Sequence, residues 1–379
     1  MPTVIDLFAG AGGLSLGAFR AGFNVGAAIE LDSHAMETHK QNFPHTVHIQ
    51  EDITTLNGNI ILQRSNIKPT DLIGVIGGPP CQGFSSIGHG DVDDTRNKLF
   101  IKFFEIVSDL QPVFFVAENV PGIMKEKYAE IRAAAFGYIP NYTFLPPISV
   151  NASEYGAPTT RTRYFFIGFR ECKAIRPISI RDVEGKKVSV ADRTTVKKAL
   201  EGLQGDIRYT PKFKSNKPLL VDYYNGEKHL QSSFFYERVT SQIPFNVGNE
   251  EYIRDYQLRH IVDGCTPTNH SKTVRARYAK LKYNEQDSIS KSKRLDPDGY
   301  CPTLRAGTGP EKGSYQAVRP IHYKYNRVIT PREAARLQGF PDWFKLPETI
   351  WHSFRQIGNS VSPIAAEQVL TAIYQKLIL

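Results

Sequence analysis

Cys81 is the residue in this sequence whose setting most strongly suggests chemistry. It follows an apolar run at residues 72–76 that predicts a buried strand, within a segment whose glycines and prolines expose the chain where that strand ends. In an open parallel α/β sheet, ligands and catalytic groups lie at the carboxyl ends of the strands. The pattern favours a nucleophilic thiol followed by a mobile glycine-containing loop, and a buried structural cysteine is the competing interpretation.

One carboxylate and two arginines could support such a thiol. Glu118 follows the apolar run 112–117, and partial desolvation at a strand end raises a carboxyl pKa toward the range useful for proton donation. Arg161 and Arg163 alternate in an extended segment, which places both side chains on the same side. One could enter the site while the other packs against a phosphate or carboxylate. The alternative for Glu118 is an ordinary loop acid.

A nucleotide-binding unit is predicted at the N-terminus. Residues 4–8 form an apolar strand, residues 9–13 a glycine-rich turn, and the following apolar positions have a helical period that ends at Gly22. The glycines let the backbone approach a ligand and direct helix N-terminal amides at it. Ser15 stands where the dinucleotide fingerprint needs its third glycine, which counts against a nicotinamide-dependent oxidoreductase.

Two acidic residues could complete an adenosine pocket. Glu30 ends the next predicted strand, where a carboxylate can accept hydrogen bonds from both ribose hydroxyls. Asp52 follows a third predicted strand near residues 47–49 and could contact the adenine edge. A helix N-cap ahead of Ile53 is an equally good interpretation of Asp52.

These elements predict an α/β fold with a doubly wound, mostly parallel sheet of seven strands over about the first 170 residues. A helix is predicted from residue 98 to residue 110, with Asn97 as its N-cap. From about residue 176 the apolar periodicity weakens, and basic and aromatic residues prevail. Another helix is clearly marked after Thr330, with a capping box to Glu333 and a stop at Gly339.

Composition limits the classes of protein. The chain has 379 residues, a net charge of +9, 41% hydrophobic and 22% charged residues, which fits a globular protein of about two domains with a polyanionic partner. A solvated basic surface is the alternative explanation of the charge. The four scattered cysteines indicate neither a disulfide framework nor a metal site. No apolar run could span a membrane and no signal pattern opens the sequence, so we expect a cytoplasmic location.

Taken together, the motifs resemble those of the cytosine-C5 DNA methyltransferases. The match spans nearly the whole chain in the family's order, and Thr159 departs from it by standing where the family usually has a glutamine. The matching segments are residues 6–13, Glu30, Asp52, residues 78–85, residues 118–120, residues 161–163, residues 332–341 and residues 358–361.

The resemblance implies a class I methyltransferase fold that uses S-adenosylmethionine, with a smaller target-recognition domain inserted into the catalytic domain. We expect the catalytic domain at residues 1–183 and 347–379 and the target-recognition domain at residues 184–346, with the C-terminal helix packed back onto the first domain. The implied cofactor-binding residues are Phe8, Gly10, Gly12, Gly13, Leu14, Glu30, Asp52, Ile53, Pro80, Asn359, Ser360 and Val361.

The resemblance also implies roles in catalysis. Cys81 would add to C6 of a flipped-out cytosine, Glu118 would hold or donate a proton at N3, and Arg163 would contact O2 and Glu118, with Arg161 in the same set. The DNA-binding residues would include Gln82, Ser85, Arg96, Thr303 and Leu304.

We therefore predict a monomeric, sequence-specific methyltransferase that acts on double-stranded DNA in a restriction-modification system. A cognate restriction endonuclease would be a functional partner without physical association. The alternatives are an RNA cytosine-C5 methyltransferase with the same catalytic parts and a non-catalytic, cofactor-binding DNA protein, and the complete set of Cys81, Glu118 and Arg163 counts against the latter.

Overall fold

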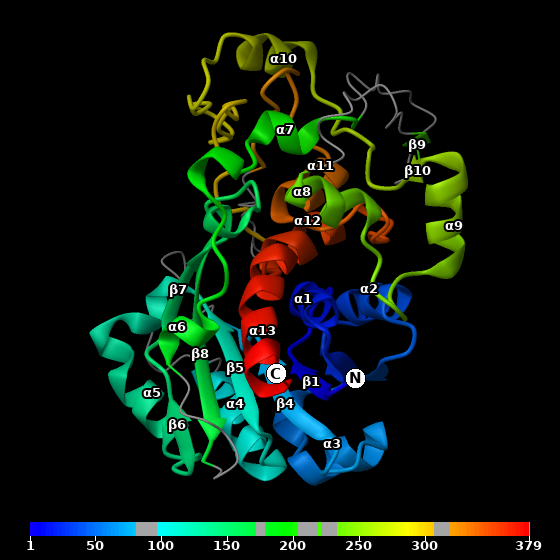
Figure 1. The fold of residues 1–379 in the computed structure, drawn as a ribbon. Helices are drawn as coiled ribbons and strands as arrows, with labels where there is room; N and C mark the ends of the chain where they lie inside the picture. Colours follow the sequence, from blue (N-terminus) through cyan, green and yellow to red (C-terminus); the bar gives the residue numbers. More distant parts are fainter. Residues whose placement is uncertain (81–96, 172–178, 204–218, 221–232, 307–318, 379) are drawn as a thin grey trace.

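A computed structural model describes residues 1–80, 97–171, 179–203, 219–220, 233–306 and 319–378. The sheet and its helices form the lower part of the view in Figure 1, and the segment 184–346 forms most of the upper part. Four of the predicted site residues, Cys81, Gln82, Ser85 and Arg96, lie outside the described residues.

One large sheet organises the lower part, in the order β3-β2-β1-β4-β5-β8-β6, with β7 also paired to β8. The first five of these strands pair in parallel, and β8 runs antiparallel to β5, β6 and β7. The main strands are β1 (Thr3–Leu7), β2 (Asn24–Ile29), β3 (Val47–Ile49), β4 (Leu72–Gly77), β5 (Phe114–Asn119), β6 (Tyr142–Phe144), β7 (Ile148–Asn151) and β8 (Thr162–Arg170). A separate pair consists of β9 (Leu219–Leu220) and β10 (Ile261–Val262).

The mostly parallel α/β prediction is confirmed, but the sheet has eight strands rather than seven. β6 pairs with residues 168–170 of β8 and β7 with residues 162–165, so two short strands share one edge of β8. Pro146 and Pro147 lie between these strands. Since proline has no N–H to donate to a ladder, the edge strand divides there.

Helices cover both faces of the sheet, as a doubly wound fold requires. Adjacent residues of β1 enter different hydrophobic cores: Val4 belongs to the core with α1 and α13, and Ile5 to the core with α3, α4 and α5. Phe114 and Phe115 of β5 divide in the same way, because successive strand side chains point to opposite faces.

The helices include short turns as well as the long covering helices (Figure 1). They are α1 (Gly13–Ala21), α2 (Ser33–Asn42), α3 (Gly58–Ser65), α4 (Asn97–Leu110), α5 (Ala129–Phe136), α6 (Ile180–Val183), α7 (Val196–Leu200), α8 (Phe234–Tyr236), α9 (Glu250–Arg259), α10 (Lys272–Ala279), α11 (Pro331–Gln338), α12 (Ile350–Asn359) and α13 (Pro363–Ile378).

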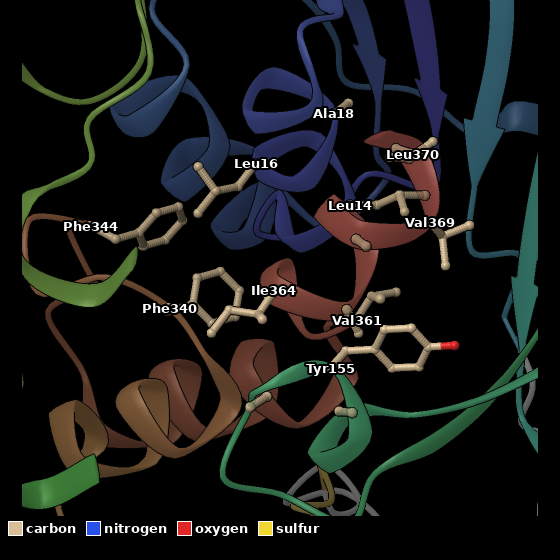
Figure 2. Close-up of a cluster of buried hydrophobic side chains, with 14 of the residues drawn as sticks. Leu14, Leu16, Ala18, Tyr155, Phe340, Phe344, Val361, Ile364, Val369 and Leu370 are labelled. Atoms are coloured by element: carbon tan, nitrogen blue, oxygen red, sulfur yellow. The ribbon is translucent and has the colours of Figure 1, made fainter. Parts of the chain in front are cut away.

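The C-terminal helix α13 packs against the N-terminal helix α1, so the two ends of the chain share one core. The approach is close at Gly17, where an added Cβ would lie 2.5 Å from the Cβ of Ala366. Figure 2 shows Leu14 near Val369 and Leu370 of α13 in this buried cluster. The predicted return of the C-terminal helix to the first domain is therefore confirmed, while the domain boundaries remain predictions.

The capped helix predicted after Thr330 is present as α11. Thr330 accepts from the N–H of Glu333, Glu333 accepts from the N–H of Thr330, and Gly339 ends the helix at φ 95°. Gly22 ends α1 in the same left-handed conformation, at φ 100°. Asn97 is the first residue of α4 rather than its predicted N-cap.

The fifth strand differs from the prediction in a way that matters for the site. β5 extends to Asn119, so Glu118 lies within the strand and pairs in register with Phe165 of β8. Pairing with β8 therefore fixes the backbone of Glu118, and a glutamate in an ordinary loop would lack this support. Within the described residues, no helix is long and apolar enough to cross a membrane.

Candidate active site

A buried ion pair joins the ends of β5 and β8. The Nε of Arg163 lies 2.7 Å from Oε1 of Glu118, and the two side chains are 13% and 10% exposed. Burial raises the pKa of Glu118, and the nearby guanidinium groups of Arg163 and Arg161 offset part of that rise. A carboxyl group in this position can hold a proton at higher pH than a solvated glutamate, as predicted from its place after an apolar run.

The chain that leads to Cys81 passes directly beside this pair. A Cβ added to Gly78 would lie 3.1 Å from Oε2 of Glu118, so the missing side chain lets the carboxylate lie against the backbone. The side-chain amide of Asn119 donates to the carbonyl of Pro79 at 3.4 Å. Pro80 is the last described residue before the gap. The segment preceding Cys81 and the acid Glu118 are thus fixed to each other, although Cys81 itself is not described.

Arg161 occupies a different position from Arg163. It is 2% exposed, and its guanidinium donates to the carbonyl of Leu304 at 3.1 Å and to the carbonyl of Asn359 at 3.3 Å. Its positive charge lowers the pKa of Glu118 and so offsets part of the effect of burial. Arg161 thus joins three segments that are distant in sequence, and its predicted place in the catalytic set remains a prediction. Thr159, at the family's glutamine position, is buried and forms a backbone bridge with Cys301.

The glycine turn has the backbone conformation of a ligand cradle. Phe8 and Gly10 have φ values of 62° and 57°, and Gly12 has a φ of 95°. A Cβ on Gly10 would meet nothing within 4 Å, which leaves open space beside its backbone. Gly12 and Gly13 are required by packing instead, since added Cβ atoms would overlap the ring of Phe43 and the carbonyl of Val361.

Glu30 lies beside this turn. One carboxylate oxygen accepts from the N–H of Gly10 at 2.9 Å and the other from the N–H of Asp32 at 2.8 Å. Burial raises the pKa of Glu30 despite these hydrogen bonds. Each oxygen retains a further lone pair, so the group can still accept hydrogen bonds from a ligand.

Asp52 adopts the N-cap role that was one of its two interpretations. Its carboxylate accepts from the N–H of Thr54 at 2.9 Å and from the hydroxyl of Thr54 at 2.8 Å, ahead of a short 3-10 helix at Ile53–Thr55. A contact with adenine remains a prediction. The side chains of Ile53 and Leu14 lie in the two hydrophobic cores, so only their backbones could contribute to a pocket.

The segment 359–361 returns to the glycine turn, as predicted from the resemblance. A Cβ on Gly13 would lie 2.5 Å from the carbonyl oxygen of Val361 and 3.2 Å from the Cβ of Ser360. The carbonyl of Ser360 accepts from the side-chain amide of Gln338 at 2.8 Å, which fixes it to α11. The side chain of Asn359 is exposed.

Thr303 and Leu304 lie where the segment 184–346 meets this site. Leu304 is buried and gives its carbonyl to Arg161, and Thr303 is partly buried. A Cβ on Gly358 would lie 2.5 Å from the backbone nitrogen of Ala306, so this loop and the segment 358–361 are in close contact. Their predicted contacts with DNA are untested by the structure.

Comparison with known proteins decides the family. The chain matches the C-5 cytosine-specific DNA methylase family model over residues 2–375. The chain belongs to this family. It is a DNA (cytosine-5-)-methyltransferase.

Several known proteins are similar to this methyltransferase over most or all of their length. The Type II methyltransferase M.XorII of Xanthomonas oryzae pv. oryzae is 35% identical over 399 residues, covering 99% of this chain and 86% of the relative. M.DdeI of Desulfomicrobium norvegicum is 32% identical, covering 98% and 88%. A crystal structure from E. coli, assigned as a prophage-encoded DNA modification methyltransferase, is 50% identical with a TM-score of 0.86 and covers 100% and 99% of the two chains. Dnmt2 of S. pombe, at 17% identity and a TM-score of 0.64 over 100% of both chains, shows the shared fold alone.

One buried group of this methyltransferase, next to the glycine turn, was not predicted from the sequence. Asp6 is fully buried and accepts a hydrogen bond of 2.6 Å from the hydroxyl of Ser15. The signal was present, because Ser15 replaces a glycine of the dinucleotide fingerprint and its helical position directs it back toward the strand. Two histidines, His39 and His48, extend this hydrogen bond into a chain, and no sequence pattern indicated that they lie close to Ser15.

Proposed function

We propose that the chain transfers a methyl group from S-adenosylmethionine to C5 of a flipped-out cytosine in duplex DNA, through covalent addition of Cys81 to C6. The observation that carries this assignment is the buried pair of Glu118 and Arg163 beside Gly78. It places an acid with a raised pKa next to the strand end that leads to the thiol. The same strand end lies beside β1 and its glycine turn, because β4 pairs with β1.

The residues of the turn fit an adenosyl ligand. The open space beside Gly10 admits a ligand to the backbone, and Glu30 is already held by two N–H donors with lone pairs to spare. A carboxylate at the end of the second strand is the group that binds ribose hydroxyls in related nucleotide folds. Phe8, the N–H groups at the start of α1 and the segment 359–361 would complete the pocket, with Asp52 and the backbones of Leu14 and Ile53 at the adenine end. When bound, S-adenosylmethionine supplies an electrophilic methyl group on a sulfonium.

The protein's own residues prepare the cytosine. The Cys81 thiolate forms a bond to C6, and the ring electrons move toward C5 while Glu118 stabilises the added charge by a proton at N3. Arg163 would hold Glu118 and contact O2. After C5 is methylated, loss of its proton and of the Cys81 thiolate restores the aromatic ring. The base must leave the stack to reach these groups, at a cost of a few kcal/mol.

The segment 184–346 is proposed to bind DNA. The side chains of Lys272 and Arg275 on α10 and of Lys280 directly after it are exposed, whereas Arg277 is bound to the carboxylate of Asp287. Exposed cations of this kind neutralise phosphates. Gln82, Ser85, Arg96, Thr303 and Leu304 would lie nearer the displaced base. The sequence recognised is a matter for experiment.

We infer a role in a restriction-modification system from the relatives named Type II methyltransferases, with M.XorII and M.DdeI among them. In such a system the enzyme would protect host DNA and would act without a physical complex with the endonuclease. We also propose that the enzyme is a monomer and that it acts in the cytoplasm.

The test combines product mapping with a thiol variant. Purified protein is incubated with S-adenosylmethionine and a mixed-sequence duplex, and 5-methylcytosine is mapped by bisulfite sequencing, with an RNA of the same sequence in parallel. We expect methylation of one cytosine within a fixed context in DNA and none in RNA. Cys81→Ala should abolish transfer and retain cofactor binding measured by calorimetry. Transfer by Cys81→Ala would refute the covalent route, and methylated RNA alone would refute the DNA assignment.

A further inference from the structure

Behind the cofactor turn, four polar side chains form a continuous hydrogen-bonded chain that the methyl-transfer reaction does not use. The hydroxyl of Ser15 on α1 lies 2.6 Å from Oδ2 of Asp6 on β1 and 3.0 Å from Nε2 of His39 on α2. Nδ1 of His39 lies 2.9 Å from Nε2 of His48 on β3. Asp6, Ser15 and His39 are completely buried, and His48 is partly exposed. We call these four residues the relay.

The relay lies against the turn itself. A Cβ on Gly12 would lie 3.1 Å from the His39 ring, which also packs against Phe43 with ring centroids 4.4 Å apart. Burial raises the pKa of Asp6, and repulsion between its charge and that of Glu30 adds to the rise. The buried end of the relay is therefore coupled by charge to the residue that we assign to the ribose.

The hydrogen-bonding capacity of these groups allows only two complete arrangements. Ser15 has one hydroxyl proton, so if it donates to Asp6, then Nε2 of His39 must donate to Ser15, and Nε2 of His48 must donate to His39. This arrangement suits an ionised Asp6. If Asp6 carries a proton on Oδ2, the oxygen that faces Ser15, each of the three hydrogen bonds reverses. Both histidines stay neutral in either arrangement, in line with the lowered pKa that burial gives them.

The two arrangements differ by one proton at the buried end. A proton that enters at Nδ1 of His48 displaces the one on its Nε2 to His39, which passes its own to Ser15, and the hydroxyl proton of Ser15 moves to Asp6. Every bond formed is matched by one broken, and the added proton ends on the carboxylate. His48 is the entry because it is the only partly exposed member of the relay, where Lys40 and Glu37 of α2 also act on it.

We propose that the relay sets the charge behind the cofactor turn, and that ionised Asp6 makes the pocket favour the cationic methyl donor over its neutral product. Loss of the methyl group converts the sulfonium of S-adenosylmethionine into the uncharged thioether of S-adenosylhomocysteine. A negative charge near the pocket attracts cationic S-adenosylmethionine more strongly than uncharged S-adenosylhomocysteine. Contacts that both ligands make do not affect this difference. The proposal rests on the assignment of the turn and Glu30 to this ligand.

The sign of the pH dependence follows from the location of the charge. Burial raises the pKa of Asp6 to about 7, with the hydrogen bond from Ser15 opposing the rise and Glu30 adding to it. Asp6 is therefore neutral below this pH and ionised above it. The affinity for S-adenosylmethionine relative to S-adenosylhomocysteine should rise as pH increases from 6 to 8. The sulfonium lowers the pKa of the amino group of S-adenosylmethionine relative to that of S-adenosylhomocysteine, so the part of the pH dependence due to Asp6 is the difference between the wild type and a variant that lacks the Asp6 carboxylate.

The experiment measures both dissociation constants by calorimetry at pH 6, 7 and 8 with the full chain. We expect the ratio of the constants to change about tenfold, the scale for single charges roughly 10 Å apart in a protein interior. By reciprocity, donor binding near pH 7 should release more protons than product binding, which titrations in buffers of different ionisation enthalpy measure.

Four variants and one control separate the relay from a structural role. Asp6→Asn should remove the rise of the ratio between pH 6 and pH 8 that Asp6 causes and leave only the contribution of the ligands' own amino groups. Ser15→Ala removes a hydrogen bond to the ionised carboxylate and should move the midpoint upward by roughly one pH unit. His39→Phe keeps the ring contact with Phe43 and should move the midpoint upward by less, while His48→Gln preserves a donor and should leave it in place. His45→Gln, at an exposed histidine three residues from His48, should change nothing.

The outcomes are distinguishable. A ratio with the same pH dependence from pH 6 to pH 8 in the wild type and in Asp6→Asn, with both ligands bound, overturns the relay and leaves the proposed function intact. The same pH dependence in Ser15→Ala, His39→Phe and the wild type, with unchanged circular dichroism, also overturns it. Absence of binding by either ligand at every pH would instead refute the cofactor assignment on which the proposal rests.

Discussion

The sheet region and the segment 184–346 satisfy their buried backbone groups by different means. In the sheet, strands such as β1 and β5 pair along their whole length, and apolar side chains fill both faces. In the segment 184–346, regular elements are short in the part that the structure describes, and buried arginines donate to loop carbonyls instead.

Arg332 on α11 illustrates the second solution. It is completely buried and donates to the carbonyls of Asp263, Pro341 and Phe344 at distances from 2.8 to 3.1 Å, as well as to the carboxylate of Asp263. Arg336 similarly joins the carbonyl of Ala199 to the carboxylate of Asp342.

A guanidinium has five donors in a fixed plane, so one side chain can replace several ladder bonds. A loop-rich surface can then keep a defined shape without strands. We infer that this frees the segment 184–346 to vary its surface for DNA recognition, while the sheet region keeps the chemistry.

The largest effect should come from the acid of the sheet region. Glu118→Gln keeps the shape of the side chain but removes the ionisable proton, so single-turnover methylation should slow by about 10² to 10⁴-fold, while DNA affinity changes little. Rapid-quench methylation and fluorescence anisotropy measure the two quantities. Equal losses of rate and DNA affinity would contradict the separation of chemistry from DNA binding.

The next largest effect should come from the arginine framework. Arg332→Met leaves Asp263 buried without its ion pair and several carbonyls without donors, so the free energy of unfolding should fall by about 3–5 kcal/mol. Arg259→Met is the matched control, because that arginine is 67% exposed and pairs with Asp255 only at the surface of α9. Its change should stay below about 1 kcal/mol in the same urea titration. Similar losses in both variants would show that buried arginines do not support the segment.

A smaller effect is expected where the sheet region depends on close apolar packing. Gly17→Ala would place a Cβ 2.5 Å from Ala366 and 2.8 Å from the backbone nitrogen of Glu367, forcing α13 away from α1. Overpacking of this kind costs about 1–3 kcal/mol. Gly137→Ala at the end of α5 would meet only carbonyl oxygens at 3.4 Å with φ at −60°, so its thermal midpoint should hardly change.

The smallest effect is expected on the stability of the two regions when the protein is acidified. In the segment 184–346, burial alone would raise the pKa of Asp287, but hydrogen bonds from Arg277 and Ser290 lower it to about 2. The stability it contributes is present above its unfolded pKa of about 3.9 and is lost as pH falls toward 2. Asp6 in the sheet has a raised pKa, so its contribution changes in the opposite direction and is lost as pH rises from about 4 to about 7.

Hydrogen exchange detected by mass spectrometry, with intrinsic rates corrected for pH, tests this contrast. Peptides around residues 284–294 should lose protection between pH 4 and pH 2, while peptides of β1 keep theirs. Asp287→Asn should lose the same protection already at pH 7. Loss of protection in β1 at a higher pH than in residues 284–294 would contradict the comparison.

The sequence predicted most of the elements that carry the site because their signals are local. An apolar run followed by glycines located the ends of β1 and β4, and Thr330 with Glu333 located the start of α11. It placed Glu118 beyond a strand end, whereas pairing with β8 extends β5 through it. It also predicted seven strands, whereas the sheet has eight, with two prolines separating β6 from β7.

Residue types and local spacing therefore determined by themselves the family and the mostly parallel α/β sheet, and they predicted Cys81, Glu118 and Arg163 as the catalytic residues. The tertiary structure alone decided which polar groups meet. It committed Arg161 to two backbone carbonyls and brought His39 and His48 from α2 and β3 to Ser15 on α1. Hydrogen bonds between residues far apart in sequence depend on how helices and strands pack in three dimensions, and no short-range periodicity records that packing.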